Sequence, residues 1–300
     1  MIVALLKSLR PKHWTKNLLV FAGYLFTIEQ KHTPDSLPSV LAAFVLFCLV
    51  TGACYIYNDA ADADRDRRHP RKCKRPIACG EAPVVAAVAF ATLLTAGSLL
   101  ASFYLDLYFG LLITAYFLLT SAYSVSLKHV VIVDLLTIAA GFVIRAVAGA
   151  VVVKVYDVGG AVQRVEISPW LLVCTTLLAL FLGLAKRRSE LVGLETSAFG
   201  HRRTLGEYTA PMLDQLLSIT AAAALIAYCL YTFTPLSKTG AAHPYMMMTV
   251  PFVIYGLFRY LFLAHTRNAG ASPEITLLED KPLLIDVVLY VVAAVVALKL

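Results

Sequence analysis

The chain has 300 residues, of which 59% are hydrophobic and only 15% are charged. A soluble protein of this length needs far more polar surface, and the sequence lacks the alternating strand pattern of an outer-membrane barrel. Because apolar stretches of about 20 residues recur along the chain, the sequence predicts an all-α protein that crosses the membrane many times. The net charge of +7 then reflects membrane orientation and an anionic ligand, and no nucleic-acid partner is expected.

Nine predicted membrane spans follow one another along a single domain that covers residues 1–300. Their expected bounds are 16–29, 38–58, 83–102, 106–124, 130–153, 167–189, 210–234, 244–265 and 283–298. The opening apolar run is too short for the core of a signal peptide. Residues 1–15 are therefore expected to form a helix on the membrane surface.

Lysine and arginine gather on one side of the predicted spans. With a cytoplasmic N-terminus, 20 of the 26 Lys and Arg residues lie on cytoplasmic segments or span ends, five lie opposite, and Arg145 lies within a span. Cytoplasmic loops of membrane proteins carry such an excess of positive charge. We therefore expect a multi-pass protein of the cell membrane, with the N-terminus and the active-site loops in the cytoplasm and the C-terminus outside.

The most polar stretch of the chain begins where the second predicted span ends. Asn58, Asp59, Asp62 and Asp66 are separated by one, three and four residues, so on a continuous helix the three aspartates share one face. Neighbouring carboxylates repel one another unless a cation lies among them, and oxygen ligands suit Mg²⁺. The sequence predicts a Mg²⁺ site on these aspartates. The alternative is a solvated acidic helix end that pairs with the arginines after it.

A basic run follows the first aspartates and consists of Arg65, Arg67, Arg68, Arg71, Lys72, Lys74 and Arg75. Arg presents a planar fork to phosphate oxygens, and Lys presents a point charge. Together with the aspartates, this run predicts a clamp for a diphosphate. The candidates for substrate binding in this region are Asn58, Arg65, Lys72 and Arg75. Other members of the run set the topology and contact lipid headgroups, and spacing alone does not separate the two groups.

Three motifs carry a resemblance to a known family. They are N-D-x-x-D-x-x-x-D at residues 58–66, "DRRHPRKCKRPIACG" at 66–80 and "LRPKHWTKN" at 9–17. The chain resembles, over essentially its whole length, the UbiA-type intramembrane prenyltransferase superfamily, which the 4-hydroxybenzoate polyprenyltransferases of ubiquinone synthesis typify. The resemblance implies a helical bundle around a central cavity open to lipid, with cytoplasmic aspartate motifs that bind Mg²⁺ and a diphosphate.

One segment departs from ordinary members of that superfamily, which carry a second aspartate motif after the sixth span. This chain has Lys186, Arg187, Arg188 and Glu190 there. The departure resembles the branch that makes decaprenylphosphoryl-5-phosphoribose, as do residues 10–22, 123–149 and 182–194. That branch transfers 5-phosphoribosyl from 5-phosphoribosyl 1-diphosphate to a decaprenyl-like polyprenyl phosphate and releases pyrophosphate, for cell-wall arabinan precursors.

The basic segment has a physical interpretation in those substrates. They bring more phosphate groups than a prenyl diphosphate does, and more anions require more cations. We expect Lys186, Arg187 and Arg188 to supply these cations, with Arg187 and Arg188 on an exposed helix end, and Glu190 is a further candidate for substrate binding. The alternative is that Lys186, Arg187 and Arg188 only set the membrane topology.

Further polar residues surround the fifth predicted span. Asp134 and Arg145 lie eleven residues apart within it, so they face the same way on a helix. Charged groups in spans mark an interior site or a structural pair, and both roles remain open here. Tyr123 and Lys128 precede the span on its cytoplasmic side and are candidates for phosphate contact, as is Lys16.

The predicted nucleophile is an oxygen of the lipid phosphate, which is already anionic at pH 7 and requires no protein base. Two other functions remain open. A prenyltransferase that joins a polyprenyl diphosphate to an aromatic acceptor would need an acidic pair near residue 186, which the sequence lacks. A transporter or non-catalytic lipid binder would show paired repeats with broken spans, and no such repeat is evident. The sequence does not decide whether the chain forms a homo-oligomer.

Overall fold

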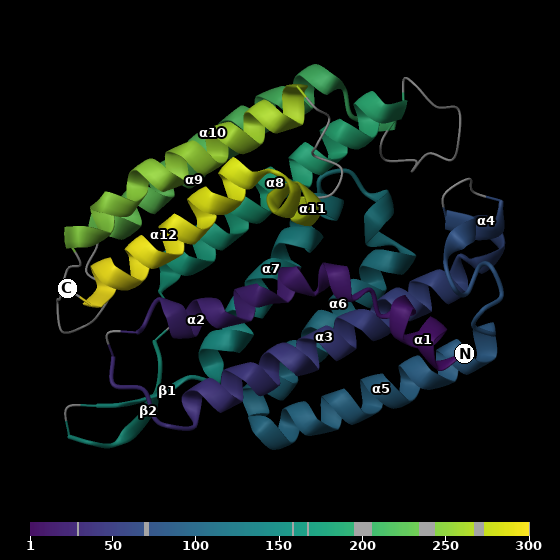
Figure 1. The fold of residues 1–300 in the computed structure, drawn as a ribbon, viewed down its shortest axis with the longest axis horizontal. Coiled ribbons are helices and arrows are strands. Elements are labelled where there is room, and N and C mark those ends of the chain that lie inside the picture. The colour runs from purple at the N-terminus through teal and green to yellow at the C-terminus, as the bar shows by residue number, and fades with distance from the viewer. Residues whose placement is uncertain are drawn as a thin grey trace.

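The computed structural model describes residues 1–28, 30–68, 72–157, 159–166, 168–194, 206–233, 244–266 and 273–299. Long helices run alongside one another, and the two termini lie towards opposite ends of the molecule (Figure 1). The α-helices are α1 (Ile2–Ser8), α2 (Ala22–Leu25), α3 (Ser36–Ala61), α4 (Ala63–Arg67), α5 (Val84–Leu105), α6 (Leu107–Val125), α7 (Val133–Val151), α8 (Pro169–Leu194), α9 (Ala210–Phe233), α10 (Val250–Thr266), α11 (Pro273–Glu279) and α12 (Lys281–Lys299). Shorter 3-10 helices are η1 (Pro11–Phe21), η2 (Lys72–Lys74), η3 (Leu127–His129) and η5 (Pro244–Thr249), and strands β1 (Lys154–Tyr156) and β2 (Val162–Arg164) form an antiparallel hairpin.

Eight helical segments among the described residues are long and apolar enough to cross a membrane. They correspond to the last eight predicted spans, with η5 and α10 joined in one of them, Tyr245–Thr266. Helices satisfy their own backbone hydrogen bonds, as the interior of a bilayer requires. The predicted all-helical membrane fold is thus confirmed. The first predicted span, 16–29, is instead a tight helical stretch made of η1 and α2, so the count of nine stays a prediction.

The helix expected over residues 1–15 is shorter in the structure. It ends at Ser8, after which Arg10 takes a left-handed backbone conformation with a φ of 53° and Pro11 begins η1. Proline suits the first turn of a helix, where its missing N–H is not needed. Leu5 packs in one core with Ile56 of α3, and this packing fixes the turn at Arg10 beside the end of α3.

Helix α7 lies near the middle of the molecule (Figure 1) and contributes to two hydrophobic cores. Its first half contributes Leu135 to a core with α8, α9, α10 and α12, and its second half contributes Ala148 to a core with α3, α6 and the hairpin. The approach of η1 to α7 is close, because a Cβ atom on Gly149 would lie 1.8 Å from the carbonyl oxygen of Val20. Glycine allows two helical backbones to meet in this way, and the approach brings the polar side chains of η1 against α7.

Asp106 joins α5 to α6 and anchors the hairpin. Its carboxylate accepts the backbone N–H groups of Tyr108 and Phe109 at 2.9 and 3.2 Å, and Arg164 of β2 donates to it at 2.6 Å. Burial raises the pKa of Asp106, but the hydrogen bond and charge of Arg164 and the two N–H groups outweigh burial and hold it below the ordinary value. The stabilisation is therefore present above the ordinary carboxyl pKa and is lost as pH falls through the lowered one. The hairpin itself was not predicted.

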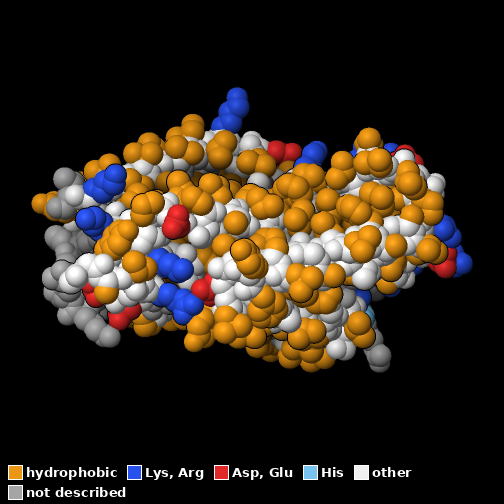
Figure 2. All heavy atoms as spheres, turned by 90° about the horizontal axis from the view of Figure 1, so that it is seen from below, with side chains coloured by type: hydrophobic (Ala, Val, Ile, Leu, Met, Phe, Trp, Pro, Cys, Tyr) orange, Lys and Arg blue, Asp and Glu red, His pale blue; other side chains and the backbone are white. Residues whose placement is uncertain are grey.

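The outer surface is apolar over the middle of the molecule. Val85, Leu93 and Leu100 of α5 are 73–82% exposed, which a bilayer accommodates and water does not. Figure 2 shows hydrophobic side chains over most of one face, with Lys and Arg side chains towards its ends. This distribution agrees with helices that cross a membrane.

Candidate active site

Two buried carboxylates lie side by side near the end of α3. Asp59 is 3% exposed and Asp66 is 1% exposed. One guanidinium nitrogen of Arg75 donates to both carboxylates, at 3.0 Å to Asp59 and 2.5 Å to Asp66. Arg10 also donates to both oxygens of Asp59, at 2.6 and 2.9 Å. Arg75 thus bridges the two carboxylates, and Arg10 binds Asp59 alone.

Asp62 does not join this pair. Helix α3 ends at Ala61 and α4 begins at Ala63, with Asp62 between them at φ −95° and ψ 4°. Its side chain is 32% exposed and pairs with Arg65 at 2.7 Å. Among the described residues no three carboxylate, His or Cys side chains converge as metal ligands. The expectation that one continuous helical face presents all three aspartates is therefore wrong, because the helix breaks at the middle one.

One oxygen of Asp66 lacks a hydrogen-bond partner. Its Oδ1 atom is buried and accepts no hydrogen bond from the described part of the chain, while Lys72 Nζ lies 4.0 Å away. A buried, unsatisfied acceptor is costly, and a hard cation is a suitable partner for it. Mg²⁺ needs only one or two protein carboxylates when phosphates and water complete its shell. Asp59 and Asp66 fit that requirement.

A second polar centre surrounds Arg187 of α8. Arg187 is 1% exposed, and its guanidinium donates to Asp134 at 2.8 Å, to Glu190 at 2.7 Å and to the hydroxyl of Tyr123 at 3.2 Å. The expectation of an exposed helix end is wrong at this position, because α7 and α8 pack together and bury the side chain between them. Asp134 therefore pairs with Arg187, and Arg145 makes separate contacts.

Tyr208 completes the surroundings of Asp134. Its hydroxyl donates to Asp134 Oδ1 at 3.2 Å and accepts the backbone N–H of Ile132 at 2.8 Å. Ile132 has a φ of 67°, a rare value for a β-branched residue. Burial raises the pKa of Tyr208, and the Asp134 carboxylate adds to the rise although the Ile132 N–H opposes it. Tyr208 therefore remains a protonated donor at neutral pH and fixes Asp134 from the side opposite Arg187.

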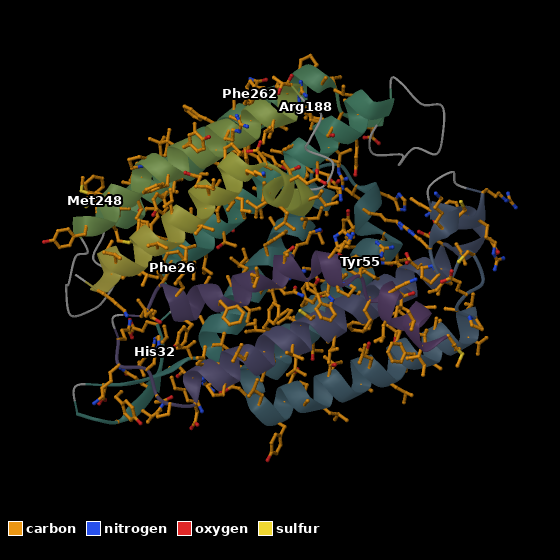
Figure 3. All side chains as sticks on the ribbon, viewed as in Figure 1. Phe26, His32, Tyr55, Arg188, Met248 and Phe262 are labelled. Atoms are coloured by element: carbon orange, nitrogen blue, oxygen red, sulfur yellow. The ribbon has the colours of Figure 1, made fainter. Side chains whose placement is uncertain are left out.

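Arg188 points away from this centre. It pairs with Asp214 of α9 and donates to the carbonyl oxygen of Ala264 in α10, and Figure 3 shows it on the same side as Phe262. Lys186 and Arg187 line the central cavity, whereas Arg188 is not part of its wall. Of the three basic residues, two thus reach the cavity.

Arg145 of α7 is a buried cation whose partners are neutral. Its guanidinium donates to the side-chain oxygen of Asn17 at 2.8 Å, to the hydroxyl of Tyr116 at 2.6 Å and to the carbonyl oxygen of Gly141 at 3.0 Å. The rings of Tyr116 and Phe142 lie 4.6 and 5.2 Å from it. No carboxylate in the described part of the chain pairs with Arg145. Its positive charge is available to an anion in the cavity.

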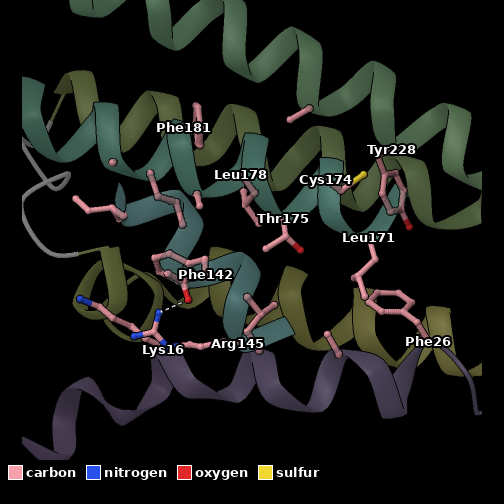
Figure 4. Close-up of a pocket in the computed structure, with 18 of the residues that line it drawn as sticks. Lys16, Phe26, Phe142, Arg145, Leu171, Cys174, Thr175, Leu178, Phe181 and Tyr228 are labelled. Carbon is pink, nitrogen blue, oxygen red and sulfur yellow. Dashed lines mark hydrogen bonds between the residues drawn. The ribbon is translucent and has the colours of Figure 1, made fainter. Parts of the chain in front are cut away.

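The cavity has a volume of about 810 Å³ and is bounded by η1, α7, α8, α10 and α12, a size typical of small-molecule sites. Figure 4 shows Lys16 and Arg145 on one side of it, Phe181 and Leu178 on another, and Phe26 and Tyr228 towards its far end. Most of its wall is apolar. The charged side chains in the wall are Lys16, Arg145, Glu166, Lys186, Arg187 and Asp286.

The carboxylate pair lies next to the cavity, and Arg10 connects the two. Tyr55 lines the cavity one helical turn before Asp59. The Arg10 guanidinium lies 4.7 Å from the centre of the Tyr55 ring while it binds Asp59. Arg10 thus links the carboxylate pair to a residue of the cavity wall.

A family model places this architecture among known proteins. The model of the UbiA prenyltransferase family matches residues 18–276. The chain belongs to this family. The resemblance inferred from its motifs is thereby confirmed.

Several relatives cover nearly the whole UbiA-family chain. A protein of Mycolicibacterium smegmatis named decaprenyl-phosphate phosphoribosyltransferase is 32% identical over 287 residues, which are 92% of this chain and 87% of the relative. A Corynebacterium glutamicum protein of the same name is 33% identical over 297 residues, 98% of this chain and 86% of the relative. A UbiA homologue from Archaeoglobus fulgidus, solved with GPP and Mg²⁺, has a TM-score of 0.68 at 18% identity and covers 99% of this chain and 100% of its own. That last likeness concerns the fold.

Within the UbiA fold, the structure separates the predicted site residues into groups. Around the carboxylate pair lie Asp59, Asp66, Lys72 and Arg75; in the cavity wall lie Lys16, Tyr123, Arg145, Lys186 and Arg187. Glu190 and Asp134 form ion pairs with Arg187. The remaining predicted residues lie in neither the pair nor the cavity wall; they are Asn58, Asp62, Arg65, Lys128 and Arg188. Sequence reasoning missed Arg10 and Asp286. Arg10 lies 49 residues from Asp59, so no local spacing connects them.

Proposed function

We propose that this chain transfers 5-phosphoribosyl from 5-phosphoribosyl 1-diphosphate to a decaprenyl-like polyprenyl phosphate and releases pyrophosphate. The observation that carries the proposal is the similarity, over nearly the full length of both chains, to relatives named decaprenyl-phosphate phosphoribosyltransferase. The basic segment of α8 supports it, because Lys186 and Arg187 stand where a prenyltransferase would need an acidic pair. A function in precursor synthesis for cell-wall arabinan is part of the same proposal.

The charges of the cavity suit substrates with several phosphate groups. Lys16, Arg145 and Lys186 reach the cavity wall from three different helices. Arg187 contributes less net charge, because Asp134 and Glu190 balance it. We assign the phosphates that enter the cavity, the 5-phosphate of the donor and the phosphate of the lipid, to the first three residues. Their electrostatic effect is large in a site of low dielectric constant.

The donor diphosphate is assigned to the carboxylate pair and its basic neighbours. Asp59 and Asp66 would hold Mg²⁺, which supplies positive charge to the oxygens of the departing pyrophosphate. Arg75 keeps the two carboxylates adjacent, and Arg10 places a second guanidinium group beside Asp59. Lys72, near Asp66, adds a further cation for the leaving group.

The proposed reaction requires little covalent chemistry from the protein's own residues. The bond between ribose C1 and the diphosphate oxygen breaks, its electron pair leaves with pyrophosphate, and a lipid phosphate oxygen forms the new bond to C1. The nucleophile is already an anion at pH 7, so the residues around it bind, orient and exclude water. The apolar wall of the cavity performs the last of these tasks.

The proposed orientation places the carboxylate pair at the cytoplasmic face of the cell membrane. Cys79 is exposed in the loop between η2 and α5 on that side. We expect a membrane-impermeant maleimide to label Cys79 in inside-out vesicles and not in sealed right-side-out vesicles. A Cys73→Ser, Cys79→Ser double variant is the control for background labelling. Labelling of Cys79 in sealed right-side-out vesicles would reverse the orientation.

The function is tested with purified protein in lipid vesicles, radiolabelled 5-phosphoribosyl 1-diphosphate and a panel of polyprenyl phosphates. The expected result is an organic-extractable radioactive lipid and one equivalent of pyrophosphate. A donor that lacks the 5-phosphate is expected to react at least roughly a hundredfold less efficiently, because unpaired cations then remain in a dry site. A prenylated aromatic acid formed from a polyprenyl diphosphate, with no ribosyl lipid, would assign the alternative function.

A further inference from the structure

Asp286 is a carboxylate without a partner inside the cavity. It lies on the apolar span α12, its residue is 8% exposed, and it forms part of the cavity wall. Among the described residues, no hydrogen bond or ion pair reaches its side chain. A buried charge within a membrane span is costly and marks a functional site by default. The fold therefore keeps a carboxylate whose partner must come from what the cavity binds.

The surroundings of Asp286 leave room for its carboxylate. A Cβ atom built on Gly256 of α10 would lie 3.0 Å from Asp286 Oδ2, so the carboxylate rests against helix backbone where any other residue would crowd it. One turn earlier on α12, Leu283 packs in the same core as Leu135 and Leu184. Those two residues neighbour the Asp134–Arg187 pair in sequence. Asp286 shares the cavity wall with Arg187 of that pair.

Both arginines of the cavity wall have other partners. Arg187 already pairs with Asp134 and Glu190, and Arg145 is held by neutral hydrogen-bond acceptors. Asp286 consequently does not serve as the counter-ion of either arginine. Its four lone-pair positions remain available to hydrogen-bond donors.

The proposed substrates differ in what they offer to a carboxylate. The phosphate groups of donor and acceptor are anions, which Asp286 repels, and a polyprenyl tail carries no hydrogen-bond donor. The ribose hydroxyl groups are donors, and they lie within a few ångströms of the 5-phosphate that the cavity cations are assigned to bind. Of the groups in the proposed substrates, only the ribose hydroxyl groups can donate uncharged hydrogen bonds to the Asp286 carboxylate.

We infer that Asp286 accepts hydrogen bonds from the ribose hydroxyl groups of the donor and determines specificity for a sugar donor over a hydrocarbon one. The inference rests on the proposed function and names the part of the donor that α12 recognises. A site built to bond a hydroxyl group strongly rejects an analogue that lacks it, because its own polar group is then left unpaired. A prenyl diphosphate in this cavity would leave the Asp286 carboxylate buried against hydrocarbon.

The test compares the unchanged protein with Asp286→Asn and Asp286→Leu, using the full donor and donors that lack the 2- or the 3-hydroxyl group. For the unchanged protein, at least one of the two deoxy donors is expected to show a kcat/KM about tenfold to a hundredfold below that of the full donor. Asp286→Leu is expected to lower kcat/KM for the full donor by a similar factor and to reduce the preference over that deoxy donor to less than about threefold. Asp286→Leu is also expected to bind geranyl diphosphate more tightly, measured by competition with the donor.

The control variant is Glu279→Gln, because Glu279 is an exposed acid at the end of α11 and lies outside the cavity wall. It is expected to retain the full donor preference. Asp286→Asn has nearly the shape of the original side chain and serves where Asp286→Leu does not fold. If the Asp286 variants discriminate against deoxy donors as strongly as the unchanged protein, the inference is overturned while the proposed function stands. An unchanged protein that forms no ribosyl lipid instead overturns the proposed function, and this inference with it.

Discussion

Asp66→Asn is expected to lower the rate of phosphoribosyl transfer at least about a hundredfold, a loss of roughly 2.7 kcal/mol of transition-state stabilisation. The side chain is 1% exposed, and its Oδ1 atom has no hydrogen-bond partner among the described residues. Asparagine preserves the shape but removes the negative charge that Mg²⁺ requires. Asp59→Asn is expected to act in the same direction, and a chelator in excess is expected to abolish turnover by the unchanged protein.

The matched control for this experiment is Asp64→Asn. Asp64 lies on the same short helix as Asp66, but its side chain is 88% exposed and, among the described residues, pairs with Arg67 alone. Its replacement is expected to leave turnover within about twofold, because exposed ion pairs contribute little. Binding of Mg²⁺ measured by calorimetry gives a readout separate from activity. Full turnover in excess chelator, or equal effects of Asp64→Asn and Asp66→Asn, would contradict the assignment of Mg²⁺ to the carboxylate pair.

Arg187→Met is expected to destabilise the folded protein by about 3–5 kcal/mol, because it leaves the fully buried Asp134 without its cation. This result differs from the weakened substrate affinity that an exposed helix end would give. The measurement is thermal unfolding in detergent, together with the yield of folded protein. Arg188→Met is the comparison, and it is expected to cost less because its partner Asp214 is 39% exposed.

A double variant separates the charge from the packing. Asp134→Leu combined with Arg187→Met removes both buried charges, and it is expected to recover at least half of the stability that Arg187→Met loses. The recovered protein is expected to remain poor in turnover, since Tyr123 and Glu190 lose the guanidinium that orients them. A double variant no more stable than Arg187→Met would show that packing around Arg187, and not its charge, sustains the fold.

The sequence predicted the long helices well because a membrane span is a local property of length and apolar composition. Eight spans appear near their expected positions. The stretch Pro11–Leu25 is also helical, but its close approach to α7 at Gly149 is a contact between distant residues that no local pattern reveals. The hairpin at residues 154–164 is held by Asp106, almost fifty residues earlier, and it was missed for the same reason.

The site was predicted in its residue types more than in its geometry. The aspartate spacing identified Asp59 and Asp66, but the break of the helix at Asp62 could not be read from a pattern that assumes continuity. The burial of Arg187 depends on how α7 meets α8, and so does its pairing with Asp134. Arg10 was missed because its role arises from a contact with a residue far away in the sequence, and Asp286 was missed because only the packed bundle places it in the cavity wall.

The volume of the cavity limits how much of the lipid acceptor can bind inside the protein. About 810 Å³ is room for a ligand of drug size, which under the proposed function the sugar of the donor and the head of the lipid acceptor share. A long polyprenyl tail must then stay in the bilayer, with only its phosphate and the first isoprene units inside the protein. Under the proposed function, the protein therefore recognises the head of its acceptor and is largely indifferent to the number of isoprene units behind it. The membrane, rather than a protein tunnel, holds the tail during turnover.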